Sequence, residues 1–278
     1  MSVSEVEALK ERQYEKLKLD SMGLNTTDEK VLDNVRTNIL RPLPQVRPHP
    51  VNNQRVCIVG GGWSLNETED ELVKLYFEGA KIVTVNGSAK WCLERNIKPS
   101  AHVVMDARSS NLKFVQLPEV PGLKYFIASQ CDPSLFDEVK DKEVHILHVL
   151  STDSDEERKI LDDYYAGNWM PVAGTNCVGF RALVLMRILG FQYFDLFGID
   201  SCYKDDQHHA YSQPENDGEV TQEFNCAGRK FIASGWQVAQ AHNFRNLVLQ
   251  NSELFHLNIH GDGLIAHMLK SAAELKGK

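Results

Sequence analysis

A short strand, a glycine cluster and the start of a helix follow one another directly within residues 55–71. Residues 56–59 (Val-Cys-Ile-Val) form an apolar run that is typical of a strand buried on both faces. Three glycines follow, and two overlapping capping boxes that begin at Ser64 and Thr68 predict a helix start. Residues 81–85 supply a second apolar run of the same kind. This order predicts a βαβ unit, and hence a parallel sheet.

The glycine cluster suits a loop that closes over a phosphate group. Gly60, Gly61 and Gly62 carry no Cβ, so their backbone N–H groups can turn outward toward an anion. The cluster lacks the third glycine of the dinucleotide-binding fingerprint, and it lacks the Gly-Lys-Ser/Thr ending of a P-loop. A tight turn without a ligand is the alternative interpretation.

A second candidate anion site precedes the most apolar helix of the sequence. Gly174, Thr175 and Asn176 stand before a helix predicted over residues 177–189, which Gly190 ends as its C′ residue. The first turn of such a helix offers N–H groups, a hydroxyl and an amide, which suit a contact to an anion or a ribose. The alternative is an ordinary N-cap on a core helix.

Two aspartates follow predicted strands at their carboxyl ends. Asp106 follows a strand predicted over residues 101–105, and Asp200 follows one predicted over residues 193–197. Ligands of open parallel sheets bind beyond the carboxyl ends of the strands. The two carboxylates could therefore bind a metal–phosphate group, or one of them could act as a base. For Asp106, the alternative is that it only caps the following turn.

Histidines mark two further segments. Residues 202–218 form a polar loop without periodicity, and loops of this length in a compact domain are more often functional than not. His208 and His209 are adjacent in it, so we expect their side chains to diverge and only one to face the site. A histidine there is a natural general base, although a surface pair is the alternative. His260 follows the last predicted strand, residues 254–259, and is a further site candidate.

The remaining segments complete the expected fold. Strands are predicted over residues 123–128 and 144–149, and a β-hairpin over residues 219–234. Residues 1–50 predict a helical extension, with a second short helix over residues 33–40, and a proline-rich linker. The first helix would pack on the body or on another copy in a homo-oligomer. Residues 51–278 would form one nucleotide-binding domain. The expected class is α/β and Rossmann-like, with a mostly parallel twisted sheet, helices on both faces and an inserted hairpin.

Composition restricts the partners of the chain. The net charge of −8 disfavours a nucleic-acid acceptor, because an acidic protein lacks the broad positively charged surface that attracts phosphate backbones. Six scattered cysteines without a Cys-x-x-Cys pair are typical of a reduced, cytoplasmic protein. No apolar run approaches the roughly 18 residues of a membrane span, so we expect no membrane partner.

Four blocks, in a fixed order, carry a resemblance to a known family: VCIVGGGWSL, VNGSAKWCLERNIKPSAHVVMDAR, AGTNCVGFRALVLMRILGFQYFDLFGID and HHAYSQPEND. They resemble the family called domain of unknown function 115, whose relatives include archaeal 6-hydroxymethyldihydropterin diphosphokinases and flagellin-modifying motility accessory factors. The resemblance covers residues 50–265 and is nearest to members from phage and prophage genomes. Trp63 stands where these families usually carry proline.

The resemblance implies a nucleotide site on the glycine loop. Donor phosphates would bind along residues 60–64, including Ser64, and at residues 174–176. The glycine loop also resembles that of the bacterial sialyltransferase-like fold, where an asparagine after the second strand lies beside the donor phosphate. That role would fall to Asn86.

The relatives divide into two reaction types. One transfers a sugar from a nucleotide sugar, CMP- or UDP-linked, to a hydroxyl; the other transfers diphosphate from ATP to a pterin hydroxymethyl group. Diphosphoryl transfer normally requires Mg²⁺, which Asp106 and Asp200 would hold. Sialyltransferase-like enzymes can work without a metal, and the base here would be His208, His209 or His260. The long histidine loop and the hairpin favour sugar transfer, since they suit an acceptor larger than a pterin. A non-catalytic nucleotide-binding phage accessory protein, in the host cytoplasm, is the remaining alternative.

Overall fold

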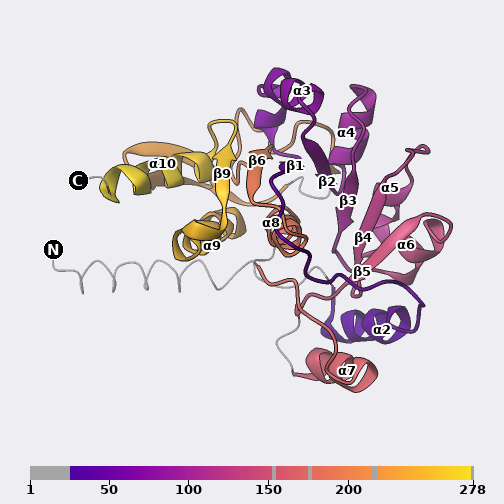
Figure 1. Ribbon diagram of the computed structural model, residues 1–278. Helices are drawn as coiled ribbons and strands as arrows, with labels where there is room; N and C mark the ends of the chain where they lie inside the picture. Colours follow the sequence, from indigo (N-terminus) through magenta and orange to yellow (C-terminus); the bar gives the residue numbers. More distant parts are fainter. Residues whose placement is uncertain (1–25, 152–154, 175–176, 215–217, 277–278) are drawn as a thin grey trace.

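One twisted sheet of seven strands forms the centre of the computed structural model, which describes residues 26–151, 155–174, 177–214 and 218–276 (Figure 1). Neighbouring strands of this sheet are all parallel, in the order β5-β4-β3-β2-β1-β6-β9. The strands are β1 Arg55–Val59, β2 Lys81–Val85, β3 Ala101–Val104, β4 Lys124–Ala128, β5 Glu143–Leu147, β6 Tyr193–Phe197 and β9 His256–Ile259. The expected Rossmann-like α/β class is confirmed.

The apolar runs of the sequence become strands because both faces of the sheet are covered. β1, β2, β4 and β6 each begin with one exposed residue and continue with four buried ones. Strands covered on both faces carry continuous apolar runs rather than an alternating pattern. β2 and β6 have the bounds that the sequence predicts, and the other strands of this sheet differ from their predicted ends by two residues at most.

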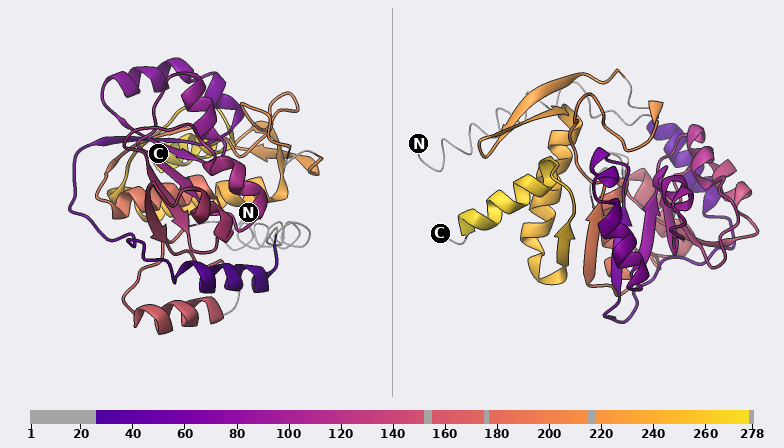
Figure 2. Two further views of the ribbon diagram at one scale, coloured as in Figure 1. Left: turned by 90° about the vertical axis from the view of Figure 1, so that its right-hand side faces the viewer. Right: turned by 90° about the horizontal axis from the view of Figure 1, so that it is seen from above.

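Helices cover both faces of the sheet (Figure 2). Within β1, Cys57 and Val59 join a core cluster with the helices that follow β1 and β2. Val56 and Ile58 point the other way, into the larger cluster that contains Phe180. The helices are α2 Asp28–Asn38, α3 Glu69–Phe77, α4 Ser88–Glu94, α5 Leu112–Val115, α6 Pro133–Glu138, α7 Glu156–Tyr165, α8 Val178–Ile188, α9 Gly235–Gln250 and α10 Leu264–Lys276, with 3-10 turns η1 Trp63–Asn66, η2 Ser109–Asn111 and η4 Ser252–Leu254.

The expected β-hairpin is present. β7 Thr221–Cys226 pairs with β8 Arg229–Ser234 in antiparallel register, apart from the main sheet. The hairpin packs against α9 and α10. It is therefore held by the last two helices, beside the same end of the sheet as the loops after β1 and β6 (Figure 2).

The N-terminal region is tied to the body by α2. The sequence predicts a short helix over residues 33–40, but α2 spans Asp28–Asn38 because the Thr27 side chain accepts a hydrogen bond from the backbone of Lys30. Asn34 donates to the carbonyls of Ala107 and Gln130, and Asn38 donates to those of Ser129 and Cys131. α2 thus binds the loops that follow β3 and β4. The helix predicted at the start of the chain falls mostly in residues 1–25, outside the described part.

The strand order reverses at β1. The chain builds β1 to β5 outward in one direction, then crosses back so that β6 pairs with the other side of β1. Ligands of such sheets bind at this switch point, beyond the carboxyl ends of the two strands. The glycine loop follows β1 there, and Gly198 follows β6. Among the described residues, no helix combines the length and apolar character needed to cross a membrane.

Candidate functional site

The glycine loop, residues 60–62, is hydrogen-bonded to the segment that leaves β6. Gly60 N–H donates to the Phe197 carbonyl at 2.8 Å, and Gly62 N–H donates to the Gly198 carbonyl at 2.7 Å. A Cβ on Gly60 would lie 2.4 Å from the Gly198 oxygen, so only glycine allows this backbone approach. These two N–H groups are engaged within the protein, which differs from the outward-turned cradle that the sequence predicts.

Gly61 faces a different neighbour. A Cβ there would lie 2.4 Å from the Tyr211 hydroxyl and 2.8 Å from Cδ2 of His209, both of them side-chain atoms of the histidine loop. Gly61 also accepts a backbone hydrogen bond from Ala210 at 2.9 Å, and Gly62 forms a β-bridge with His209. Residues 209–211 of the histidine loop, the polar loop predicted over residues 202–218, therefore lie beside the glycine loop.

Asp200 holds the start of η1. Its Oδ2 accepts a hydrogen bond from the Ser64 N–H at 2.9 Å, and the residue is 4% exposed. A Cβ on Gly62 would lie 2.3 Å from the same oxygen, so a side chain at position 62 would clash with the carboxylate. Burial raises the pKa of Asp200 to about 6, and hydrogen bonds from Ser64 offset part of this effect. Asp200 and Ser64, which are separate candidates in the sequence, are thus hydrogen-bonded to each other at the switch point.

The raised pKa of Asp200 predicts a specific pH dependence of stability. The unfolded chain releases this proton near pH 3.8 and the folded chain near pH 6, so ionisation lowers the free energy of unfolding as pH rises through that window. The amide of the Asp200→Asn variant does not ionise, so the variant does not lose stability in this way. Its free energy of unfolding, relative to the unsubstituted protein, is therefore expected to rise between pH 4 and 7, by up to roughly 3 kcal/mol. Urea unfolding across this range is the measurement, with exposed Asp70→Asn as control; a flat or falling difference would refute the assignment.

His208 and His209 do not diverge as expected. Their rings meet edge to face with centroids 4.5 Å apart, and their Nδ1 atoms are in contact. The segment is irregular rather than extended, so the alternation of a strand does not apply to it. His208 also meets the ring of Tyr203 at 5.2 Å, and His209 that of Tyr211 at 5.9 Å. The two histidines form the middle of a row of four rings along the loop.

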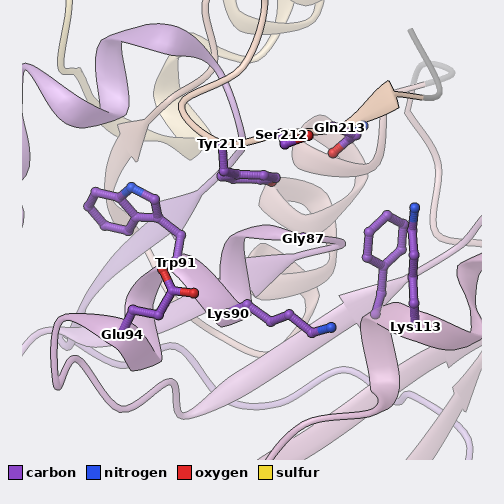
Figure 3. Close-up of a pocket in the computed structure, with 9 residues that line it drawn as sticks. Gly87, Lys90, Trp91, Glu94, Lys113, Tyr211, Ser212 and Gln213 are labelled. Carbon is purple, nitrogen blue, oxygen red and sulfur yellow. The ribbon is translucent and has the colours of Figure 1, made fainter. Parts of the chain in front are cut away.

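A cavity of about 230 Å³ lies beneath Tyr211, at the carboxyl end of β2 (Figure 3). Gly87 belongs to its wall, and a Cβ there would lie 2.6 Å from the Tyr211 ring. Lys90 from α4 and Lys113 from α5 both reach this space, which Glu94 and the rings of Trp91, Phe114 and Tyr211 also border. Two ammonium groups against one carboxylate make the cavity a suitable place for an anion with an aromatic portion.

Asn86 directly precedes Gly87, which lines this cavity. Its backbone is left-handed, with φ of 49°, and its N–H points to the Val103 carbonyl at 3.3 Å. The side-chain Oδ1 is buried and has no hydrogen-bond partner among the described residues. Buried polar atoms are rarely left without a partner, so a water molecule or a ligand group would complete the surroundings of this oxygen.

Asp106 and Asp200 are not brought together. β3 and β6 are three strand spacings apart in the sheet, about 14 Å. Arg108 binds both oxygens of the Asp106 carboxylate, with its Nε at 3.1 and 3.0 Å, while Asp200 is bound by Ser64. The pair does not fit one Mg²⁺ ion. No cluster of three or more His, Cys, Asp or Glu side chains suited to a metal occurs within the described ranges.

His260 is turned toward the sheet. Its Nε2 lies 2.8 Å from Oδ1 of Asp195, and its ring stacks on Phe197 with centroids 4.0 Å apart. Asp195 is 2% exposed and sits two residues inside the end of β6, where Arg55 also reaches its other oxygen at 3.4 Å. The ring of His260 is therefore held against Asp195 and Phe197 of β6, whereas the rings of His208 and His209 contact each other.

The second predicted anion site is only partly described. Gly174 has a φ of +139°, and a Cβ there would lie 3.0 Å from Arg181. Thr175 and Asn176 lie outside the described residues. At the N-terminus of α8, a Cβ on Gly179 would lie 2.9 Å from Ile199, so this helix begins against the segment that leaves β6.

Lys90, Lys113 and Tyr211 are the candidate site residues that the sequence interpretation missed. Lys90 stands in the first turn of the helix after Asn86-Gly87, which is a local signal. Lys113 comes from α5 and Tyr211 from the histidine loop. Nothing in the sequence indicates that these two residues line the same cavity as Lys90. Their assembly depends on the strand order and on the path of the loop.

Comparison with known proteins yields one family and a fold neighbour. Residues 29–206 match the family described as 6-hydroxymethylpterin diphosphokinase MptE-like. The structure of the MAf glycosyltransferase from Magnetospirillum magneticum AMB-1 superposes with a TM-score of 0.66 and 14% identity, over 87% of this chain and 38% of that one. The chain thus spans less than half of that protein, and the likeness establishes the fold alone.

Weaker likenesses complete the comparison. A mammalian sialyltransferase superposes with a TM-score of 0.40 and 12% identity, over 91% of this chain and 85% of that one. Similarity at this level does not establish a shared fold. No curated protein matches the sequence.

Proposed function

Because the chain belongs to the 6-hydroxymethylpterin diphosphokinase MptE-like family, we propose that it is a nucleotide-dependent group transferase that moves a sugar from a nucleotide sugar to a hydroxyl acceptor. The observation that carries this proposal is the cavity beneath Tyr211. There two lysines and three aromatic rings line a space of about 230 Å³ at the carboxyl end of β2, directly after Asn86. That combination suits the phosphates and base of a nucleotide.

The donor would bind across this cavity and the glycine loop. Its phosphates would lie near Lys90 and Lys113, whose ammonium groups favour negative charge, with Asn86 beside the bridging phosphate. Tyr211 covers both Gly61 and Gly87, so the donor would lie under this ring or take its place. A CMP- or UDP-linked sugar has the required anion and base.

The histidine pair would act on the acceptor. As the acceptor oxygen forms a bond to the anomeric carbon, the bond from that carbon to the donor phosphate oxygen breaks, and its electron pair leaves with the nucleotide. The acceptor proton passes to a ring nitrogen of His208 or His209. The lysines of the cavity would stabilise the negative charge that develops on the leaving phosphate. This reaction needs a positioned base and a positive cavity, and both are close to the switch point.

Transfer of diphosphate from ATP to a hydroxymethyl group is the second candidate, because the family is described by that activity. It normally requires Mg²⁺ held by carboxylates. The strands that precede Asp106 and Asp200 are three strand spacings apart, about 14 Å, and each carboxylate is bound within the protein. This separation favours sugar transfer. A non-catalytic nucleotide-binding protein is the third candidate, and the same experiment tests it.

Thermal unfolding with CMP, UDP, GDP or ATP, each with and without Mg²⁺, separates the three candidates. A ligand at about 100 times its Kd adds about 2.7 kcal/mol to the stability of the folded state. We expect CMP or UDP to raise the Tm without a requirement for Mg²⁺. A rise with ATP and Mg²⁺ alone would support diphosphoryl transfer. A rise with any nucleotide but no turnover with nucleotide sugars or ATP would support the non-catalytic candidate, and no rise at all would contradict nucleotide binding.

The lysines provide the matched variants. The Lys90→Ala/Lys113→Ala double variant is expected to weaken nucleotide binding at least about 100-fold, since charged hydrogen bonds to phosphate are worth roughly 1.5–3 kcal/mol each. Lys140→Ala removes an exposed lysine between α6 and the amino end of β5, which does not line the cavity, and this variant is expected to bind nucleotide normally. Equal binding by the two variants would exclude the cavity beneath Tyr211 as the nucleotide site.

A further inference from the structure

A second cavity, of about 270 Å³, lies between η1 and the hairpin β7-β8. It shares no lining residue with the cavity beneath Tyr211. Trp63 and Phe231 form its floor; both are buried, at 7% and 5% exposed. The start of the histidine loop, through Tyr203 and Lys204, forms one wall. We call it the hairpin cavity.

The charges of the hairpin cavity balance one another. Three cationic side chains, Lys204, Arg229 and Lys230, line it together with three carboxylates, Glu67, Asp205 and Asp262. This differs from the cavity beneath Tyr211, where two lysines oppose one glutamate. A balanced wall gives no net attraction to an anion, but it offers both donors and acceptors of strong hydrogen bonds.

Two of these cations are held in place from two sides. Lys204 pairs with Glu67 and lies over the Trp63 ring, with Nζ 4.8 Å from the ring centroid. Arg229 pairs with Asp262 at 2.6 Å and lies over the Phe231 ring at 4.7 Å. A carboxylate and an aromatic face together restrict each cation more than either would alone. Both ion pairs lie at the rim of the cavity, where the four side chains are 41–61% exposed and can turn toward a ligand.

We propose that the hairpin cavity binds the acceptor of the transfer reaction, and that this acceptor is a neutral, hydroxyl-rich saccharide. The hydroxyl groups of a sugar both donate and accept, so they can match carboxylates and cations in one wall, whereas an anion would face three carboxylates. The inference rests on the proposed function, since it names the acceptor class of that same reaction.

The position of the histidines supports the assignment. The histidine loop borders the hairpin cavity at residues 202–205 and the cavity beneath Tyr211 at residues 211–213. His208 contacts Tyr203 on the first side, and His209 contacts Tyr211 on the second. A base in this pair would therefore lie between an acceptor in one cavity and a donor in the other.

Trp63 connects the floor of the hairpin cavity to the glycine loop. Its indole Nε1 donates to the Cys202 carbonyl at 3.1 Å, which ties η1 to the start of the histidine loop. Proline, the usual residue of the resembling families here, has neither an indole N–H nor an aromatic face for Lys204. Trp63 thus supplies both the hydrogen bond to Cys202 and the aromatic face under Lys204.

Ligand-observed NMR with neutral methyl glycosides of glucose, galactose and N-acetylglucosamine tests the proposal on the full chain. We expect at least one to bind, and its Kd to rise at least 10-fold in both Glu67→Gln and Arg229→Gln, which disturb opposite walls. Lys140→Gln serves as the exposed control. Inorganic phosphate and N-acetylneuraminic acid are the anionic probes, and we expect neither to be displaced by the glycoside.

The outcomes separate this inference from the proposed function. Absence of glycoside binding, or binding that neither variant weakens, would overturn the inference even if CMP or UDP still raised the Tm. Competition between phosphate and the glycoside would overturn it in favour of a second anion site. Glycoside binding that both variants weaken, without any nucleotide-induced rise in Tm, would support a saccharide cavity and contradict the proposed transfer. Circular dichroism of both variants excludes unfolding as the cause of lost binding.

Discussion

Gly60→Ala is expected to lower the free energy of unfolding by roughly 3 kcal/mol or more, the upper range for an added methyl group in a packed site. The new Cβ would lie 2.4 Å from the carbonyl oxygen of Gly198, and backbone atoms hydrogen-bonded between β1 and β6 cannot move aside. Chemical denaturation of the two proteins measures this loss directly. An unchanged free energy of unfolding would mean that the two strand exits are not held together as described.

Gly61→Leu is the matched comparison, one residue along the same loop. Its side chain would meet Tyr211 and His209, which are side chains of a loop and can be displaced. We therefore expect a smaller loss of stability than for Gly60→Ala, but loss of the nucleotide-induced rise in Tm. If Gly61→Leu keeps full nucleotide affinity, the glycine cluster serves only the packing of the loop.

His208→Ala is expected to lower kcat by about 10²- to 10⁴-fold, the usual contribution of a general base. Of the two histidines, His208 contacts the ring of Tyr203 beside the hairpin cavity, where the acceptor would bind. The nucleotide-induced rise in Tm should persist, because His208 does not border the cavity beneath Tyr211. Transfer rates with the donor identified by the thermal-unfolding panel are the measurement.

His209→Ala separates the roles within the pair. His209 bridges to Gly62 and contacts Tyr211, so its loss is expected to weaken donor binding more than the chemical step. A KM for donor that rises while kcat changes little would agree with this division. Should His209→Ala reduce kcat as much as His208→Ala and leave donor binding intact, the assignment of the base to His208 is wrong.

Much of the fold could be predicted from local patterns. β6 has the predicted bounds because a short run of aromatic and apolar residues, interrupted only by Asp195, lies between the C′ glycine of a helix and a Gly-Ile-Asp turn, a pattern typical of a buried strand. The hairpin and α8 follow from equally local signals, a turn at Asn225 to Gly228 and a C′ glycine at 190. α2 begins at Asp28, before the predicted start at residue 33, because its N-cap Thr27 lies outside the apolar pattern on which the prediction rests.

The candidate site was predicted less well, since it depends on which loops meet. Asp106 and Asp200 both follow strands, yet β3 and β6 are not neighbours, so the carboxylates do not form a pair. The adjacent histidines contact each other because their segment is irregular, which a residue pattern does not reveal. Lys113 reaches the candidate nucleotide cavity only because α5 follows β3, two strands away from β1.

The amino-acid sequence by itself determined the strands, the glycine turn and the residues at the carboxyl ends of the strands, because apolar runs and glycines act over a few neighbouring residues. The tertiary structure alone decided which of those ends lie together. It placed β6 beside β1, laid the histidine loop along Gly61, and thereby formed two cavities with different charge on the two sides of His208 and His209. Strand order and loop path arise from packing between residues distant in sequence, and no local pattern records them.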